Sequence, residues 1–183
     1  MRLMVINGSV RQGRMSDNMQ AWAKEILGQD EELELDFVDL KEVDLPFFNE
    51  AVIPSENHGK YENPKGQAWA DRVAKAEAFI FITPEYNHGP AAVLKNAIDW
   101  VYEGWMYKPV AFISYGGAAA GTRAVQQLKQ NVLNVDLFPI NNNVHIPIWG
   151  GGIDESGRPQ PHYDDILKKA VKRLKDLQQR LAP

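Results

Sequence analysis

Hydrophobic and polar positions follow two alternating spacings along the chain. Short apolar runs, typical of buried strands, alternate with longer segments whose apolar residues recur every three or four positions, as in helices that face a core. The apolar runs predict strands at Leu3–Asn7, Leu33–Asp39, Ala78–Thr83, Val110–Tyr115 and Phe138–Ile146. The helical spacing predicts helices at residues 19–27, 67–76, 91–101, 121–133 and 163–181.

This alternation determines the expected fold class. Five strands that alternate with five helices predict βαβ units, and therefore an α/β fold with a parallel sheet and helices on both faces. The chain contains no repeat and no linker, so we expect one domain over residues 1–183. Residues 147–161 and 44–64 are expected to be loops, and the second is longer than most connections. Whether 44–64 is a functional rim or a flexible excursion stays open.

Composition excludes several classes of function. The formal net charge of −4 predicts no broad basic surface for nucleic acid. The absence of cysteine excludes disulfides, thiol catalysis and thiolate metal sites, so redox chemistry would need an organic cofactor or a metal on other ligands. The N-terminus enters a strand directly and no apolar run is long enough to span a membrane, so we expect a cytoplasmic protein without a membrane partner.

The turn Thr83–Pro90 is the most informative segment for function. It connects the end of a buried strand to a helix, and in open α/β sheets ligands bind at the carboxyl ends of strands. Its two prolines stiffen the backbone, so that amide groups can be held toward a flat ligand. An aromatic ring and several hydrogen-bonding side chains lie between them, at Glu85, Tyr86, Asn87 and His88.

The loop after the first strand predicts an anion site. It combines the start of a helix, whose free N–H groups favour anions, with the guanidinium of Arg11, which matches a phosphate group. Ser9, Ser16 and Asn18 add hydroxyl and amide donors. The alternative is a simple turn in which Ser16 or Asp17 caps the helix. We favour the phosphate site, because capping does not require Arg11.

A third loop, Ser114–Gly121, follows the fourth predicted strand. The glycines at 116 and 117 let a backbone approach a ligand closely, although alone they would indicate only a flexible turn. The ends of these strands should lie side by side, which favours one ligand site built from all three loops. The four histidines have no metal-binding spacing and no serine lies in a nucleophile elbow. We therefore expect no metal and no catalytic side chain, with a cofactor carrying the chemistry.

An ordered set of motifs resembles the flavodoxin-like NADPH-dependent FMN reductase family, which includes quinone, chromate and azo-dye reductases. The motifs are Gly8-Ser9-x-Arg11 with Ser16 and Asn18, Pro84-Glu85-Tyr86-Asn87, Leu94-Lys95-Asn96-Ala97-x-Asp99-Trp100 and Gly116-Gly117. The resemblance implies a flavodoxin-like, doubly wound, five-stranded parallel sheet. It also implies FMN as cofactor and NADPH or NADH as co-substrate.

The resemblance further implies three groups of FMN contacts. The phosphate would be held by Ser9, Arg11, Ser16 and Asn18. The isoalloxazine would lie along Pro84, Glu85, Tyr86 and Asn87, largely through backbone groups. Its other edge would be closed by Ser114, Gly116 and Gly117. Arg14 and Arg123 would be spare cations near this rim; either could meet the 2′-phosphate of NADPH, although a solvated surface arginine is the expected state of each.

The resulting functional hypothesis is hydride transfer from NAD(P)H to bound FMN, followed by two-electron reduction of a small acceptor. Quinones, azo compounds, metal oxyanions and free flavin are the acceptors considered. The alternative is a flavodoxin-type electron carrier or an FMN-based redox sensor. The moderate charge of −4, and flavin loops whose aromatic residues are chiefly Tyr86 and Tyr115, favour the reductase.

The segment Asp99–Tyr107 leads to an expectation about assembly. Trp100, Tyr102, Trp105, Met106 and Tyr107 are residue types enriched at interfaces. The alternative is that Trp100 and Trp105 cap the edge of the core, which would suffice for Trp100 alone. With Tyr102, Met106 and Tyr107 added, the segment predicts a contiguous apolar patch that a monomer would rarely expose. We therefore expect a homodimer, or a homotetramer, with the flavin sites near the interface.

Overall fold

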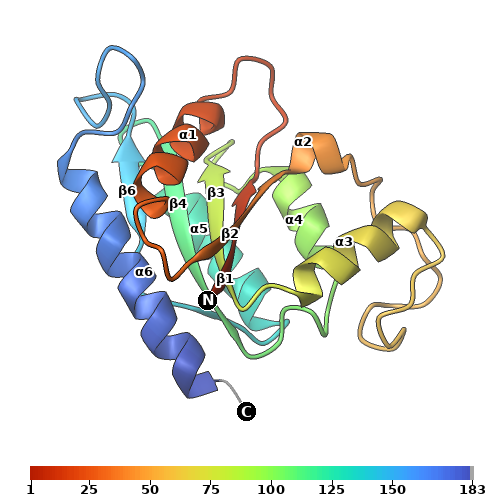
Figure 1. The fold of residues 1–183 in the computed structure, drawn as a ribbon. Coiled ribbons are helices and arrows are strands. Elements are labelled where there is room, and N and C mark those ends of the chain that lie inside the picture. The colour runs from red at the N-terminus through yellow and green to blue at the C-terminus, as the bar shows by residue number, and fades with distance from the viewer. Residues whose placement is uncertain (182–183) are drawn as a thin grey trace.

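The computed structural model describes residues 1–181 and shows a parallel sheet between two layers of helices (Figure 1). The strands are β1 (Arg2–Asn7), β2 (Glu34–Asp39), β3 (Ala78–Pro84), β4 (Lys108–Gly116), β5 (Leu137–Pro139) and β6 (Val144–Pro147). The helices are α1 (Ser16–Leu27), α2 (Leu40–Val43), α3 (Pro64–Ala74), α4 (Ala92–Asp99), α5 (Thr122–Leu133) and α6 (His162–Leu181). Among these residues, no helix is both long and apolar enough to cross a membrane.

The strand order is β2-β1-β3-β4-β5, with every pair parallel. This is a doubly wound order. Strand β2 is added on one side of β1, and the later strands β3 and β4 are added on its other side. The predicted α/β class, parallel sheet and helices on both faces are therefore confirmed. The short helix α2 was not predicted.

The predicted fifth strand, Phe138–Ile146, is interrupted. Its two pieces, β5 and β6, both pair with β4, β5 with Lys108–Val110 and β6 with Ile113–Gly116. Between them the side chain of Asn143 replaces a backbone partner, because its Oδ1 accepts from the Phe112 N–H at 2.9 Å. One side-chain amide thus maintains the hydrogen bonding of β4 where the edge strand leaves the sheet.

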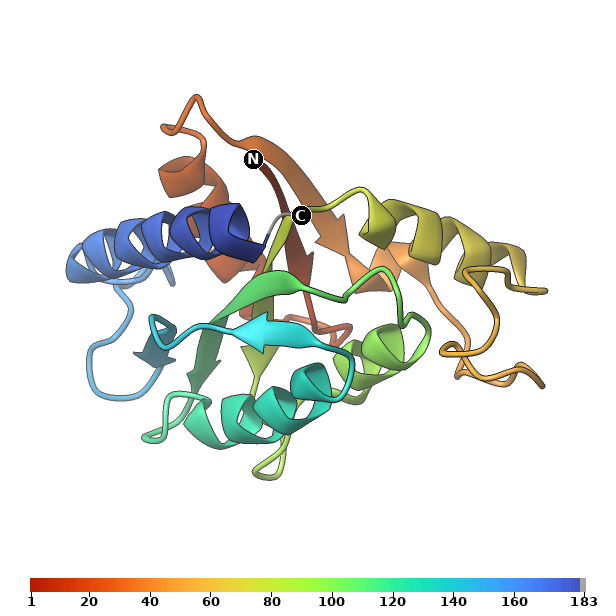
Figure 2. The ribbon, with the colours of Figure 1, turned by 90° about the horizontal axis from the view of Figure 1, so that it is seen from below.

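Helices cover both faces of the sheet (Figure 2), and a hydrophobic core lies between the sheet and each helix layer. Alternate residues of each strand point to opposite faces. Phe79 and Phe81 therefore pack under α3, α4 and α5, while Ile80 and Ile82 pack under α1 and α6. A strand buried on both faces needs a continuous apolar sequence, as β3 has.

The segment 44–64 begins as an anchored connection. The side-chain amide of Asn96 in α4 donates to the Pro46 carbonyl at 2.8 Å, and its oxygen accepts from the Phe48 N–H at 3.0 Å. The indole N–H of Trp100 donates to the same Pro46 carbonyl at 2.8 Å. The start of this segment is therefore fixed beside α4, which decides against a wholly flexible excursion for this part.

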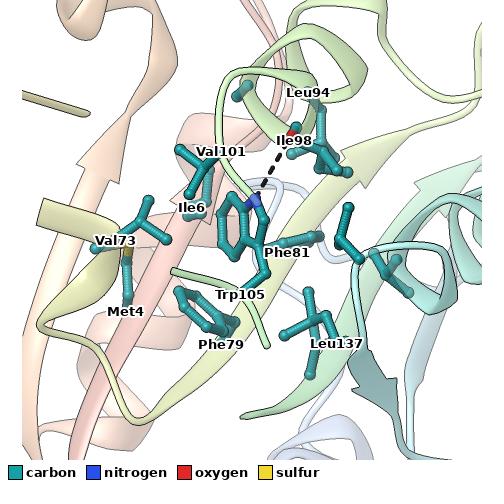
Figure 3. Packing of buried hydrophobic residues seen from close by; sticks show 14 of the residues in the cluster. Met4, Ile6, Val73, Phe79, Phe81, Leu94, Ile98, Val101, Trp105 and Leu137 are labelled. Carbon is teal, nitrogen blue, oxygen red and sulfur yellow. Dashed lines mark hydrogen bonds between the residues drawn. The ribbon is translucent and has the colours of Figure 1, made fainter. Parts of the chain in front are cut away.

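The expected exposed aromatic patch after α4 is wrong. Trp100 and Trp105 are both fully buried within the protomer. Trp105 packs edge-on against Phe79 and Phe81, with ring centroids 4.8 and 5.8 Å away, and donates its N–H to the Ile98 carbonyl (Figure 3). The chain after α4 folds back under the sheet, so these rings fill the core; of the segment's large apolar residues, Tyr107 alone is mostly exposed.

Replacement of Trp105 tests this packing. Trp105→Ala should lower the free energy of unfolding by about 3–5 kcal/mol, because a buried indole is replaced by a cavity. Val52→Ala is the control: Val52 is 50% exposed in the loop before α3, and its loss should change stability by less than about 0.5 kcal/mol. Urea unfolding followed by circular dichroism measures both. Equal midpoints for Trp105→Ala and the parent would contradict the core assignment.

Candidate functional site

Three loops meet at the carboxyl ends of β1, β3 and β4. In-register pairing places Asn7 opposite Ile82, and Pro84 opposite Tyr115, so these strands end at one edge of the sheet. The loops are joined by two further backbone bonds. The Gly8 N–H donates to the Ile82 carbonyl at 2.9 Å, and the Glu85 N–H to the Tyr115 carbonyl at 3.2 Å. The predicted meeting of the three loops is therefore confirmed.

Gly8 is required by this close approach. A Cβ at position 8 would lie 2.8 Å from the Ile82 carbonyl oxygen and 2.9 Å from the Leu94 side chain. Any other residue would force the first loop away from β3.

A hollow of about 660 Å³ opens between the first loop and the turn after β3. Its lining residues are Val10, Arg11, Glu85, Tyr86, Asn87, Ala91, Ala92 and Val93. Four of the residues predicted to bind the cofactor are among them, Arg11, Glu85, Tyr86 and Asn87. Pro84, at the end of β3, is buried behind this turn, as is Gly116 at the end of β4.

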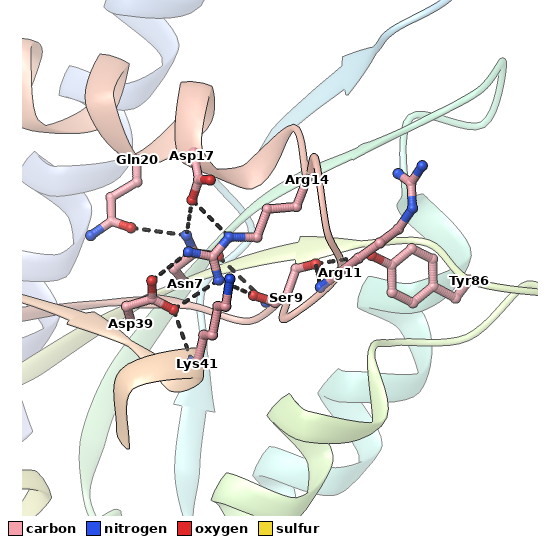
Figure 4. Close-up of polar contacts among 9 residues, drawn as sticks. All are labelled: Asn7, Ser9, Arg11, Arg14, Asp17, Gln20, Asp39, Lys41 and Tyr86. Carbon is pink, nitrogen blue, oxygen red and sulfur yellow. Dashed lines mark hydrogen bonds and ion pairs between the residues drawn. The ribbon is translucent and has the colours of Figure 1, made fainter. Parts of the chain in front are cut away.

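The turn after β3 has a defined shape. Tyr86 and Gly89 exchange backbone hydrogen bonds of 2.9 Å in both directions. Asn87 and His88 between them have φ values of 50° and 68°, the left-handed pair that a type I′ turn requires. The turn places the Tyr86 hydroxyl 2.9 Å from Ser9 Oγ (Figure 4). This contact links the turn after β3 to the loop after β1.

Ser16 is the residue that most clearly fits an anion. It is fully buried at the start of α1, and its Oγ lies close to the Tyr115 hydroxyl but forms no hydrogen bond of normal geometry. Leaving a buried hydroxyl unsatisfied costs about 1–3 kcal/mol. No side chain caps the first turn of α1, so its N–H groups also lack that usual partner. An anion at this helix start would satisfy both kinds of donor.

A buried tyrosine stands beside these hydroxyls. Burial raises the pKa of Tyr115 to about 12. Like any tyrosine it is protonated at neutral pH, and burial keeps it so well into the alkaline range, so its hydroxyl can act as a neutral hydrogen-bond donor or acceptor.

Arg14 is not a spare cation, contrary to expectation. Its side chain is only 8% exposed and forms a two-pronged ion pair with Asp39, which is 16% exposed. Nη1 donates to Asp39 Oδ1 at 2.8 Å, Nε to Asp17 Oδ1 at 2.7 Å, and Nη1 also to the Ser9 carbonyl (Figure 4). Gly13, with φ of 62°, turns the chain so that Arg14 points back to the end of β2. Its guanidinium is used inside the loop and is not free for a nucleotide phosphate.

The Asp39 carboxyl is held ionised by this pair. Burial by itself would raise the pKa of Asp39. The hydrogen bonds from Arg14 and from the Lys41 N–H outweigh burial and lower that pKa below its ordinary value. Asn7 extends the network, since its side-chain amide donates to Gln20 Oε1 at 2.9 Å and to Asp17 Oδ1 at 3.3 Å.

Arg123 is also paired rather than spare. Its Nε donates to Glu85 Oε1 at 2.5 Å, and its backbone N–H to Glu85 Oε2 at 3.2 Å. The Glu85 carboxylate thus ties the turn after β3 to the start of α5. This leaves the backbone of Glu85, rather than its charge, for a ligand, in keeping with the predicted backbone contacts.

Two other candidate side chains are engaged within the protein. Ser114 Oγ donates to the Ala120 carbonyl at 2.7 Å and lies 2.6 Å from His145 Nδ1. The amide of Asn18 donates to the Ser156 carbonyl at 2.9 Å. Each therefore braces a loop around the site in this structure.

The start of the segment 147–161 contacts the third loop of the site, which the sequence did not lead us to expect. The Ile148 N–H donates to the Gly116 carbonyl at 2.8 Å, and the ring of Trp149 lies against Gly117. The available signal was a tryptophan directly before three glycines, in a loop that follows an edge strand.

Comparison with known proteins identifies the family. The family model described as NADPH-dependent FMN reductase matches residues 1–150. The chain belongs to the NADPH-dependent FMN reductase family. This is the family that the motifs predicted. The description also confirms the expected oxidoreductase class, with FMN and NADPH.

Individual proteins similar to this chain are consistent with this family. The chain is 32% identical over 180 residues to the NAD(P)H-dependent FMN reductase LOT6 of Saccharomyces cerevisiae, covering 92% of this chain and 94% of that protein. It is 35% identical over 125 residues to the NAD(P)H-dependent FMN reductase C4B3.06c of Schizosaccharomyces pombe, covering 68% of this chain and 62% of that protein. It is 34% identical over 137 residues to the NAD(P)H:quinone oxidoreductase of Solanum tuberosum, covering 73% of this chain and 66% of that protein.

Among solved structures, the flavoenzyme NAD(P)H:(acceptor) oxidoreductase FerB of Paracoccus denitrificans superposes with a TM-score of 0.75 at 23% identity. The match covers 98% of this chain and 97% of that one. At this identity the match establishes the fold alone, and it confirms the flavodoxin-like architecture.

The Arg14–Asp39 pair generates a prediction about stability and pH. At pH 7, Asp39→Asn should lower the free energy of unfolding by roughly 2–3 kcal/mol. This is somewhat less than the usual cost of breaking a buried pair, because Asp17 still accepts from Arg14. The pKa of Asp39 is lower in the folded state, so the pair stabilises fully above the unfolded pKa of about 3.9 and loses its effect as pH falls through the folded pKa.

The measurement is urea unfolding of parent and Asp39→Asn between pH 7 and pH 3. The stability difference should stay constant down to about pH 4 and shrink below it. Glu31→Gln, a change at an exposed carboxylate, is the control and should be neutral at every pH. A difference that grows in acid would contradict the lowered pKa.

Proposed function

We propose that the protein binds FMN and uses NAD(P)H to reduce a small acceptor, with quinones as the first class to test. The observation that carries this proposal is the buried, unpartnered hydroxyl of Ser16 at the uncapped start of α1. The loop that leads into Ser16 contains Arg11, which lines a hollow together with Glu85, Tyr86 and Asn87. Groups suited to a phosphate therefore lie next to a surface suited to a flat ring.

The chain's own residues have separable tasks in this proposal. Arg11, the Ser16 hydroxyl and the first N–H groups of α1 would hold the phosphate. The rigid turn at residues 84–89 would present backbone groups to the ring, and protonated Tyr115 would keep the floor neutral. When bound, FMN supplies the hydride and electron chemistry, so no side-chain base is required. Preorganised donors at the ring would stabilise negative charge that develops there.

Steady-state oxidation of NADH and NADPH by the FMN-loaded protein tests the activity. A benzoquinone, an azo dye, chromate and free flavin are compared as acceptors. Sustained turnover with at least one of them supports the reductase. Tight FMN binding without turnover would instead favour the electron carrier or the redox sensor.

Arg11 provides a prediction about cofactor affinity. Arg11→Ala should weaken FMN binding by about one to two orders of magnitude, because charge-assisted bonds to phosphate contribute roughly 1.5–3 kcal/mol. Riboflavin, which has no phosphate, should bind parent and variant alike. Arg173→Ala, which removes an exposed arginine from α6, is the control. Flavin fluorescence titration measures all three proteins, and an unchanged FMN affinity would make Arg11 only a surface charge.

A homodimer would have to form through a different surface from the one first predicted, because Trp100 and Trp105 are buried. An apolar hollow of about 350 Å³ lies beside α4 and joins the first hollow through Val10, Ala92 and Val93. Phe47 borders it with 79% of its surface exposed. We propose that a second copy covers this face, because it is an exposed apolar surface that is continuous with the hollow of the site. A twofold arrangement would then add partner residues to the acceptor pocket.

Matched charge substitutions distinguish the two faces. Phe47→Asp should shift the protein toward monomer in sedimentation velocity at micromolar concentration, because it places a charge in an apolar contact. Tyr107→Asp, on the originally predicted segment and 56% exposed, should leave the assembly unchanged. The reverse pattern would restore the first prediction, and a monomeric parent with full activity would remove the interface altogether.

A further inference from the structure

Trp149 is unlike the other tryptophans of the chain. Trp22, Trp69, Trp100 and Trp105 are buried, whereas Trp149 is 74% exposed. An indole is among the largest apolar surfaces a residue can present, and its partly polar ring is enriched where proteins bind other molecules. The position of this one exposed indole in the described chain therefore carries information.

Backbone contacts fix where Trp149 sits. β6 pairs with β4 up to Pro147 and Gly116, and the next residue, Ile148, donates its N–H to the Gly116 carbonyl at 2.8 Å. Trp149 follows directly, and its six-membered ring covers Gly117. A Cβ at position 117 would lie 2.7 Å from that ring, so glycine is what allows the indole to rest on the loop.

The chain then turns sharply away from the indole. Gly150 and Gly151 have φ values of 97° and 90°, and the Gly152 N–H returns to the Pro147 carbonyl at 3.1 Å. The turn closed by this bond encloses Ile148 and Trp149. It therefore holds the ring at the carboxyl end of β4, next to a loop of the candidate site, with most of its surface free.

We propose that Trp149 is a contact residue for the ring system of the flavin, at the edge of the site formed by Gly116 and Gly117. This inference rests on the proposed function. A flat conjugated ring is the ligand chemistry that suits an indole, through stacked or edge-to-face contact. The contact would be to the ring and not to the phosphate, which would lie with Arg11 and Ser16 in the first loop.

Hydroxyl-radical footprinting with peptide mass spectrometry tests the contact directly. The oxidation rate of Trp149 should fall at least severalfold when FMN is added at saturation. Saturating riboflavin should give the same protection, and inorganic phosphate none. Tyr107, exposed at the opposite end of β4, is the internal control and should keep its rate.

Affinity measurements provide a second, independent readout. Trp149→Ala should weaken FMN and riboflavin by the same factor, roughly three- to tenfold, as expected for loss of one aromatic contact. Trp149→Phe should restore most of the affinity, because it keeps a flat ring. Arg11→Ala, in contrast, should affect FMN alone.

The outcomes separate this inference from the proposed function. If both flavins bind while Trp149 oxidation is unchanged, the contact is overturned and the proposed function stands. Protection by NAD⁺ or a quinone but not by flavin would also overturn it, in favour of a contact to the second substrate. If Trp149 is oxidised much more slowly than Tyr107 before any ligand is added, another copy of the chain covers it, and the flavin contact is overturned. If neither flavin binds, the proposed function and this inference fail together.

Discussion

In-register parallel pairing of β1, β3 and β4 is the constraint on which the rest of the structure depends. It ends these strands at one edge and brings together loops separated by up to about a hundred residues in sequence. Gly8 and Glu85 then continue the backbone bonding beyond the strands themselves. The loops are therefore extensions of a rigid sheet, which is the support that a preorganised site needs.

The first loop depends on a second constraint, the buried Arg14–Asp39 pair. Desolvating two charges offsets much of their attraction, so such a pair is weak evidence for added stability. Its geometry suggests a positioning role. One guanidinium contacts the end of β2, the start of α1 and the Ser9 carbonyl. The loop can therefore keep Ser16 unpartnered without collapsing onto it.

Local pattern was sufficient for the first four strands, the five longer helices and the meeting of the three loops, because hydrophobic spacing and parallel topology determine them. It was insufficient wherever a side chain's partner is distant in sequence. Trp105 was assigned to a surface because composition alone cannot distinguish an interface from a core; Phe79 and Phe81, which bury it, belong to another element. Arg14 was assigned to solvent because its partner Asp39 lies 25 residues away. The interruption of the fifth strand depends likewise on one contact, from Asn143 to β4.

The site has two sides with different physical character, and each constrains a different part of the function. Its floor is polar and buried, with Ser9, Ser16, Ser114 and Tyr115 held by the sheet edge. Its rim is apolar and exposed, with Val10, Phe47, Tyr86 and Trp149 on four separate loops. Buried polar groups reject ligands that leave them unsatisfied, whereas apolar surface discriminates weakly between flat molecules of similar size. We infer that the floor selects one cofactor strictly, while the rim admits a range of acceptors and is the part to vary when acceptor preference is studied.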